Sequence, residues 1–333
     1  MHYVIDYFTN KFFNNAKLIL MLLLASFGHA NSETLTHSSL KASQQISNQE
    51  KTQWQALHKN PITQQSYFVL HNIGNIYLFK DNHLKPEPII DLKSYFPNLQ
   101  TLNAFTLHPS FNIQQDDGYL TLYSAHTEPE DTTKSTLRVQ EKINSNKQKL
   151  EVVISEWQFE NKKLMPFNIK TKKPREVLRL PISSIDKGII QLRFNPYVKP
   201  WNEGYGELYF TLQGDHNQLD SALYSGSILK INPARFGFNS YTIPNTNPFT
   251  NNGQIADEVI VTGLKNFHEI HWAKDGNKKF IITRTSKQNF TASTVNYGSD
   301  LRHSKSTLKS IEAPLPQQSN SVIYRGMKFA KYR

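Results

Sequence analysis

From Ser66 onward, short runs of β-forming residues alternate with Asn, Asp, Gly and Pro, and no window has the periodicity of an amphipathic helix. Runs of Val, Ile, Leu, Tyr, Phe and Thr that alternate with polar residues are typical of half-buried strands. The pattern therefore predicts an all-β protein. The predicted strands are Tyr67–His71, Asn75–Lys80, Tyr119–Ala125, Lys149–Glu160, Val177–Leu180, Glu207–Gln213, Ser227–Ile231, Glu258–Thr262 and Lys279–Thr283.

A strand–turn–strand motif recurs along these runs, with a glycine near the start of the second strand. The copies are Phe105–Pro109 with Gly118–Tyr123, Leu192–Pro196 with Gly206–Phe210, Ile270–Gly276 with Lys279–Ile282, and Gly74–Phe79 as a second half alone. Gly74 and Gly118 lie 44 positions apart, and Gly118 and Gly206 lie 88 apart. A period of about 40 to 50 residues is that of a four-stranded propeller blade. The repeat favours a β-propeller, with a pair of face-to-face sheets as the alternative.

The first thirty residues have the organisation of a secretory signal peptide. Lys11 and Lys17 precede the apolar run Leu18–Phe27, and Gly28 and Ala30 are small residues at the positions that signal peptidase requires. The run is about half of the ~20 residues that a membrane-spanning helix needs, and a short membrane anchor is the alternative. We expect cleavage after residue 30, a periplasmic or secreted protein, and no membrane span after the leader is removed.

Two polar segments are expected to lack regular structure. Residues 31–65 are rich in Ser, Thr, Gln, Asn and Lys, which predicts a flexible lead-in to a single propeller domain at 66–333. The stretch 285–310 is equally polar and is interpreted as a long mobile loop. The apolar fraction of 38% is sufficient for a core in the rest of the chain.

Charge and cysteine content restrict the classes of function. The sequence contains no cysteine, which excludes disulfides, thiolate metal sites and cysteine nucleophiles. The net charge of +11 suits an anionic lipid or an anionic cell-surface polymer, and a solvated surface with no dedicated partner is the alternative. No nucleic-acid-binding motif is present, so nucleic acid is not an expected partner.

Several motifs occur in an order that resembles the glucose/sorbosone dehydrogenase family, the soluble quinoprotein sugar dehydrogenases. The resemblance covers roughly residues 66 to 330. It rests on Phe105–Phe111, Asp117–Tyr123, Ser155–Phe159, Val177–Pro181, Gly206–Asp215, Ser225–Pro233, Tyr241–Phe249, Gly263–Asn266 and Val322–Gly326. Each motif is weak by itself, and the joint order carries the resemblance.

The resemblance implies a six-bladed β-propeller that binds pyrroloquinoline quinone and calcium near its central axis and oxidises a small-molecule sugar. In this family a histidine takes a proton from the sugar while hydride passes to the quinone. Calcium polarises the quinone carbonyl, and cationic groups neutralise the carboxylates of the cofactor. Val322–Gly326 resembles the strand that opens the last blade, so we expect that blade to be incomplete in this chain.

The sequence departs from the family pattern at its functional positions. Lys187 stands where the family has its catalytic histidine; the alternative is a solvated loop lysine beside Asp186. Lys265 and Asn266 stand at the cofactor-binding Arg-Asn pair, where lysine keeps the charge and loses the bidentate geometry of arginine. The sequence thus assigns Lys187 to catalysis, and Lys265 and Asn266 to cofactor binding.

Neighbouring residues are candidates for weaker roles. His268 follows the Lys-Asn pair and is a candidate cofactor contact or a hydrogen-bonded structural histidine. Asp215 ends a strand in a turn and is a candidate calcium ligand or a turn-closing side chain. His271 lies three positions after His268 in a segment predicted to be extended, so the two point to opposite faces and do not form a zinc pair. Glu269, between them, is expected to be a surface charge.

Two functions follow from these assignments. The first is an exported quinone-dependent aldose dehydrogenase. The second is a catalytically degenerate propeller that binds carbohydrate or a protein partner, because a shared fold does not confer an activity. Motifs of other enzyme classes, such as G-x-S-x-G, the P-loop and H-E-x-x-H, do not occur in the sequence.

Overall fold

The computed structural model describes residues 54–63, 66–71, 74–80, 83–131, 150–160, 168–169, 173–214, 224–264, 269–272, 279–285, 289–302, 310–314, 322–324 and 327–329. Within these residues the regular structure consists of β-strands and two short 3-10 helices, Leu92–Ser94 and Ile185–Lys187. The all-β prediction is therefore confirmed. None of the helices in this part of the chain has the length and apolar character needed to cross a membrane.

The described strands form four antiparallel sheets and one hairpin. Sheet 1 contains β1 (Trp54–Lys59), β2 (Ser66–His71), β3 (Asn75–Lys80) and β4 (His83–Leu84), with β5 (Ile90–Asp91) beside β3. Sheet 2 contains β6 (Thr101–Leu107), β7 (Thr121–Pro129), β8 (Leu150–Glu160) and β10 (Arg175–Ile182), with β9 (Asn168–Ile169) beside β8. Sheet 3 contains β11 (Ile189–Phe194), β12 (Leu208–Leu212), β13 (Ile228–Ile231) and β14 (Val259–Val261). Sheet 4 contains β15 (Glu269–Trp272), β16 (Lys279–Thr285), β17 (Asn289–Asn296) and β18 (Ser310–Pro314), and β19 (Val322–Tyr324) pairs with β20 (Met327–Phe329).

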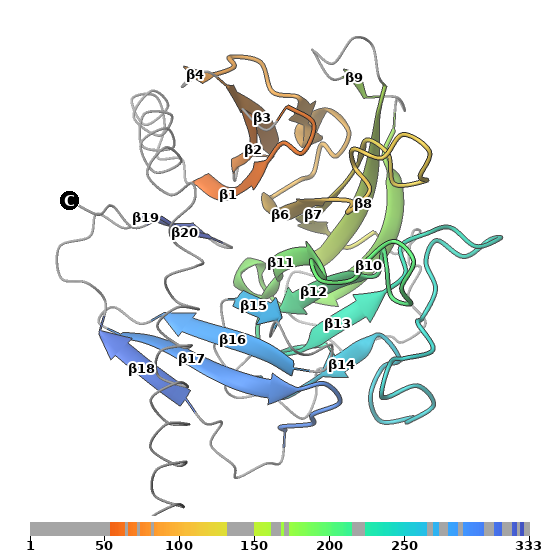
Figure 1. Ribbon diagram of the computed structural model, residues 1–333, viewed down its shortest axis with the longest axis vertical. Coiled ribbons are helices and arrows are strands. Elements are labelled where there is room, and N and C mark those ends of the chain that lie inside the picture. Colours follow the sequence, from red (N-terminus) through yellow and green to blue (C-terminus); the bar gives the residue numbers. More distant parts are fainter. Residues whose placement is uncertain are drawn as a thin grey trace, which may run out of the picture.

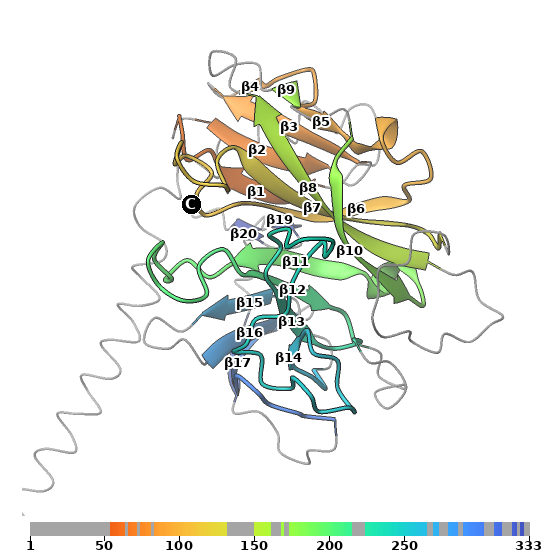
Figure 2. The same cartoon turned by 90° about the vertical axis from the view of Figure 1, so that its right-hand side faces the viewer.

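The four sheets are arranged radially around one axis (Figure 1). The first strand of each sheet is the innermost: β6 contacts β1 and β11, and β11 contacts β15. The hairpin of β19 and β20 contacts β1. Figure 2 shows the molecule turned by 90°, with sheet 1 above β11 and β12 to β17 below it, while the long strands of sheet 2 reach down past β11. Radial four-stranded meanders are the arrangement of a β-propeller, and two face-to-face sheets are excluded.

The structure differs from the sequence predictions in three segments. The first described strand, β1 at Trp54–Lys59, lies inside the segment 31–65 that was expected to be a flexible lead-in. Strand β17 lies in the stretch 285–310, so the interpretation of that stretch as one long loop is wrong. Its polar sequence forms a strand because β16 and β18 pair with it on both sides. The repeat predicted that Gly74 begins the second strand of a blade, but Gly74 precedes β3, the third strand of sheet 1.

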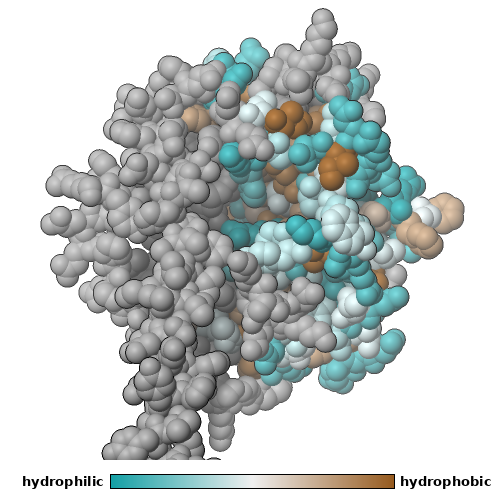
Figure 3. Space-filling model, in the orientation of Figure 1, coloured by the Kyte–Doolittle hydropathy of each residue, from teal (hydrophilic) through white to brown (hydrophobic). Residues whose placement is uncertain are grey.

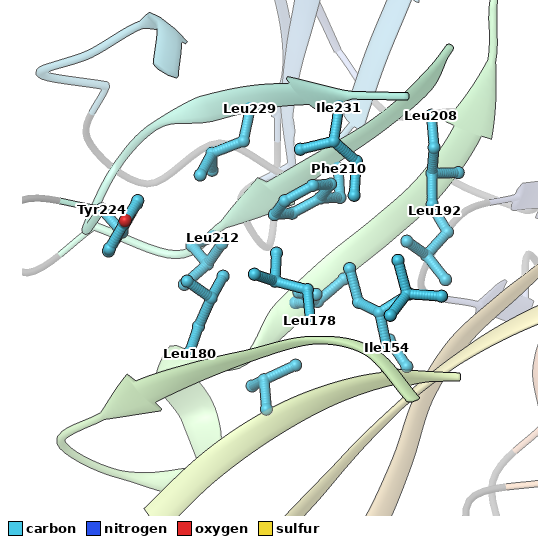
Figure 4. Packing of buried hydrophobic residues seen from close by; sticks show 14 of the residues in the cluster. Ile154, Leu178, Leu180, Leu192, Leu208, Phe210, Leu212, Tyr224, Leu229 and Ile231 are labelled. Atoms are coloured by element: carbon cyan, nitrogen blue, oxygen red, sulfur yellow. The ribbon is translucent and has the colours of Figure 1, made fainter. Parts of the chain in front are cut away.

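Each interior sheet is buried on both faces, because alternate side chains of one strand point to opposite sides. In β12, Leu208, Phe210 and Leu212 pack against sheet 2, whereas Tyr209 packs against sheet 4. Three hydrophobic cores result, one between each pair of neighbouring sheets from sheet 1 to sheet 4. Figure 4 shows the middle core, in which Ile154, Leu178 and Leu180 of sheet 2 face Leu192, Phe210 and Leu229 of sheet 3.

The recurring glycine has a packing role beside β6 and β7. The ring of His108 lies so close to Gly118 that a Cβ there would be 1.7 Å from His108 Nδ1. The same nitrogen accepts a hydrogen bond of 3.1 Å from the backbone N–H of Ser110, which fixes the ring. The Leu-His-Pro turn and the following glycine of the motif thus pack as one unit.

A buried ion cluster stabilises sheet 2. The Arg179 side chain is fully buried; its Nη1 donates to Glu151 Oε2 at 2.6 Å, its Nη2 to Glu128 Oε1 at 2.7 Å and its Nε to Glu176 Oε2 at 2.8 Å. Burial opposes the guanidinium charge, but the hydrogen bonds to Glu176, Glu151 and Glu128 outweigh it and raise the pKa of Arg179. The three carboxylates come from β7, β8 and β10, so Arg179 joins neighbouring strands of one sheet.

Replacing Arg179 by methionine is expected to lower the free energy of unfolding by about 3–5 kcal/mol, because three carboxylates lose their common cation. Urea denaturation followed by tryptophan fluorescence at pH 7 measures the change. The matched control is Arg302→Met, which removes a partly exposed pair with Asp300 (2.8 Å) and is expected to change stability by less than about 1 kcal/mol. Equal effects of the two substitutions would contradict the role of the cluster.

Candidate functional site

Three loops that carry predicted site residues, or their neighbours, converge at one end of the axis. We call this end the start face and define it by the described loop residues 183–188, 213–214, 224–226 and 262–264. Lys187 Nζ donates to the carbonyl oxygen of Gly214 at 3.3 Å. Leu264 N donates to the carbonyl oxygen of Gly226 at 2.8 Å. A Cβ on Gly214 would lie 2.5 Å from the carbonyl oxygen of Leu264, so glycine is required for this close approach.

Of the predicted site residues, Lys187 is the one that the structure describes. Asp215, Lys265, Asn266 and His268 lie outside the described residues. The residue before Asp215 and the residue before Lys265 are Gly214 and Leu264, which are in contact. The backbone positions that lead into these predicted residues are therefore close to each other and to Lys187.

Lys187 is held by acceptors on two sides. Besides the Gly214 carbonyl, the carboxylate of Asp186 lies 3.5 Å from Nζ. A hydrogen bond from the Ser184 hydroxyl to Asp186 (2.6 Å), together with the nearby Lys187, lowers the pKa of Asp186. An ammonium group satisfies both acceptors, and the side chain is only 22% exposed. These contacts hold the side chain in one position at the start face.

A second polar group lies on the axis itself, on the innermost strands of three sheets. His58 comes from β1, Arg193 from β11, and Glu269 and His271 from β15. Glu269 Oε2 lies 3.0 Å from His271 Nε2, and Arg193 Nη1 lies 3.5 Å from His271 Nδ1. The tautomer of His271 with a proton on Nε2 satisfies both contacts, since Nδ1 then accepts from the arginine. We call these four residues the axial group.

Burial and neighbouring charge shift the pKa values of two members of the axial group, His58 and Arg193. Burial lowers the pKa of His58 to about 4, and the positive charge of Arg193 contributes to this shift, so that His58 is neutral at pH 7. Burial also lowers the pKa of Arg193, and the charge of Glu269 opposes that shift. Arg193 and His271 keep side-chain exposures of 27% and 41%.

The axial group has no recognisable signature in the sequence. His58 lies in the segment interpreted as a lead-in, and Arg193 is a single charged residue within a predicted strand–turn motif. The expectation that Glu269 is a surface charge is wrong, because Glu269 is only 9% exposed and pairs with His271. The buried amide of Gln191 accepts from Ile270 N at 2.9 Å, which fixes β15 against β11 and with it the neighbouring Glu269 and His271.

Comparisons with known proteins support the fold. No protein-family profile matches the chain, and no curated protein matches it significantly. Among solved structures, the soluble aldose sugar dehydrogenase of Escherichia coli in its apo-form is similar, with a TM-score of 0.50 and 15% identity over 74% of this chain and 62% of that one. A putative oxidoreductase (glucose dehydrogenase) from Thermus thermophilus has a TM-score of 0.50 and 17% identity over 74% and 63%.

This protein therefore has the fold of the soluble sugar dehydrogenases, and the resemblance deduced from its motifs is confirmed at the level of the fold. The chain spans less than two thirds of the length of either matched structure.

The protonation of His58 gives a testable pH dependence. Because its pKa is lower in the folded chain, the unfolded chain binds a proton first as the pH falls below about 6.5. The stability that neutral His58 contributes is complete above this pH and is lost as the pH falls towards 4. The expected loss is about 3 kcal/mol, since each pKa unit corresponds to about 1.4 kcal/mol. Burial also lowers the pKa values of His108 and His126, so an assigned NMR titration of His58 is the direct measurement.

The substitution Arg193→Gln removes the positive charge beside His58 and is expected to raise the pKa of His58. The matched control, Arg302→Gln, removes a charge that does not affect this histidine and should leave the pKa unchanged. A His58 that titrates near 6.5 in the parent protein would show that the ring is solvated, contrary to the structure.

Proposed function

We propose that this protein is an exported aldose dehydrogenase in which a sugar binds at the start face and its hydride passes to pyrroloquinoline quinone. The convergence of the loops that precede Asp215 and Lys265 on Lys187 carries the proposal. The fold shared with an aldose sugar dehydrogenase and the order of the family motifs support it. Export rests on the organisation of residues 1–30.

The quinone, when bound, supplies the hydride acceptor of the reaction. Its carboxylates require fixed positive charge, and the Lys187 ammonium meets this need at the start face. We assign Lys265 and Asn266 to the same task and His268 to a contact beside it, from their positions in the motif. Lysine binds a carboxylate as a point charge, so this set orients the cofactor less strictly than an Arg-Asn pair.

The described residues do not fit calcium at the Gly214 carbonyl. That oxygen accepts from the Lys187 ammonium, which would repel a divalent cation at the same place. Nor do the described residues contain a group of three His, Cys, Asp or Glu side chains suited to a metal ion. The assignment of Asp215 as a calcium ligand therefore stays a prediction, and no step is derived through the metal.

Lys187 is proposed to bind and orient rather than to accept the proton of the sugar hydroxyl. A general base must direct a lone pair at the substrate, whereas Nζ is already engaged with the Gly214 carbonyl and lies beside Asp186. The same observation favours a second candidate function, a propeller that binds carbohydrate without turning it over. The two candidates differ in turnover and agree on a sugar at the start face.

The purified full chain, mixed with pyrroloquinoline quinone, is expected to change the absorbance of the quinone saturably and to reduce a redox dye with at least one aldose of a sugar panel. Lys187→Met is expected to weaken quinone binding at least tenfold, because one fixed positive charge is lost. Lys199→Met, at an exposed lysine of another loop, is the control and should bind like the parent chain.

Parallel titrations with calcium and with EDTA test whether the metal contributes. Saturable sugar binding by calorimetry without dye reduction would favour the binding protein over the dehydrogenase. Absence of both quinone binding and sugar binding would overturn both functions.

A further inference from the structure

The loop between β13 and β14 carries two exposed phenylalanines. Phe236 is 73% exposed and Phe238 is fully exposed, and among the described large hydrophobic residues only Trp201, at 82%, is comparable. The chain that follows β13 extends beyond the sheets at the right of Figure 1. Figure 3 shows a hydrophobic protrusion at the same edge of the molecule. Exposed apolar groups of this kind mark interaction sites when they are held in place.

The two phenylalanines stand on a tight hairpin. Phe236 N donates to the Asn239 carbonyl at 3.1 Å, and Asn239 N donates to the Phe236 carbonyl at 3.0 Å. Gly237 has a φ of +60°, the left-handed conformation that this turn needs, and a Cβ there would meet nothing within 4 Å. The turn geometry therefore displays Phe238 at the tip.

The base of the hairpin is fixed to the body of the protein. Arg175 Nη1 donates to the Ser240 carbonyl at 2.7 Å, and Arg175 Nη2 donates to the Pro233 carbonyl at 2.6 Å. The Ser240 hydroxyl donates to the Val177 carbonyl at 2.8 Å. The apolar tip is thus presented in one orientation, although it packs on nothing within the described part of the chain.

The small apolar area of the hairpin and its positive charge favour a lipid bilayer over a protein as its partner. Two phenylalanines offer about 150–250 Å² each, well below the ~800 Å² per partner of a stable protein–protein interface. A lipid bilayer accepts an isolated apolar tip, because it needs no complementary surface. Arg235 is the only charged residue from Pro233 to Thr250, it is exposed, and the chain has a net charge of +11. Both charges complement an anionic surface.

We propose that the hairpin Arg235–Phe238 is a membrane-docking element. Phe236 and Phe238 enter the interfacial region of a bilayer that contains anionic lipids, and Arg235 lies among the phosphate headgroups. The element is independent of the proposed sugar oxidation. It places the protein at a membrane surface through a reversible contact of the folded domain.

The absence of cysteine from the sequence allows one label at a chosen site. Phe238→Cys in the full chain, labelled with an environment-sensitive fluorophore, is mixed with vesicles of phosphatidylglycerol and phosphatidylcholine that carry nitroxide lipids. We expect a blue shift and quenching at position 238. The control, Trp201→Cys with the same label, reports on an equally exposed aromatic position between β11 and β12 and should show neither.

Two further variants separate the apolar and the charged contributions. Adding Phe236→Ser to the chain labelled at 238 is expected to lower the apparent partition coefficient about tenfold. Adding Arg235→Glu should weaken binding to anionic vesicles and have little effect with phosphatidylcholine alone. Every variant contains residues 18–27, so any tethering by that apolar run is common to all of them.

No quenching at position 238, or equal quenching at 238 and 201, would overturn the proposal. A blue shift that grows with protein concentration in the absence of lipid would also overturn it and identify a second copy of the chain as the partner. A blue shift produced by dextran sulfate as well as by vesicles, without nitroxide quenching, would replace the membrane with a soluble polyanion.

Discussion

The structure depends on strands whose two faces serve two different hydrophobic cores. In β12, Leu208, Phe210 and Leu212 are buried against sheet 2, and Tyr209 on the opposite face is buried against sheet 4. A sheet with two apolar faces must be covered on both sides, and a ring of sheets meets this requirement at every interior position. The radial order of the sheets, the convergence of their loops and the axial group are consequences of this pattern.

Much of the fold could be predicted from the sequence, because strand residues alternate locally. All nine predicted strands correspond to strands of the structure, with ends that shift by a few residues. What failed was the prediction of disorder from polarity: Asn289–Asn296 is polar and still forms β17, since pairing on both edges satisfies its backbone. The amino-acid composition of a segment does not indicate whether other strands will pair with its edges.

The candidate site was harder to predict for a related reason. Lys187 was proposed because a family motif points to its position, but its contact with Gly214 depends on a loop from another part of the chain. His58 and Glu269 belong to no motif, Arg193 lies in a repeat copy without a role of its own, and the three are far apart in the sequence. They come close together because β1, β11 and β15 are the innermost strands of three sheets arranged around the same axis.

The wide sequence separation of the axial residues also bears on how the molecule folds. Each sheet is a local meander and can form early, whereas His58 comes near Arg193, and Arg193 near His271, only after their sheets have docked. Loop-closure entropy delays such long-range contacts until the hydrophobic interfaces are in place. The contacts among the axial residues therefore form last, after the individual sheets have folded and packed against one another.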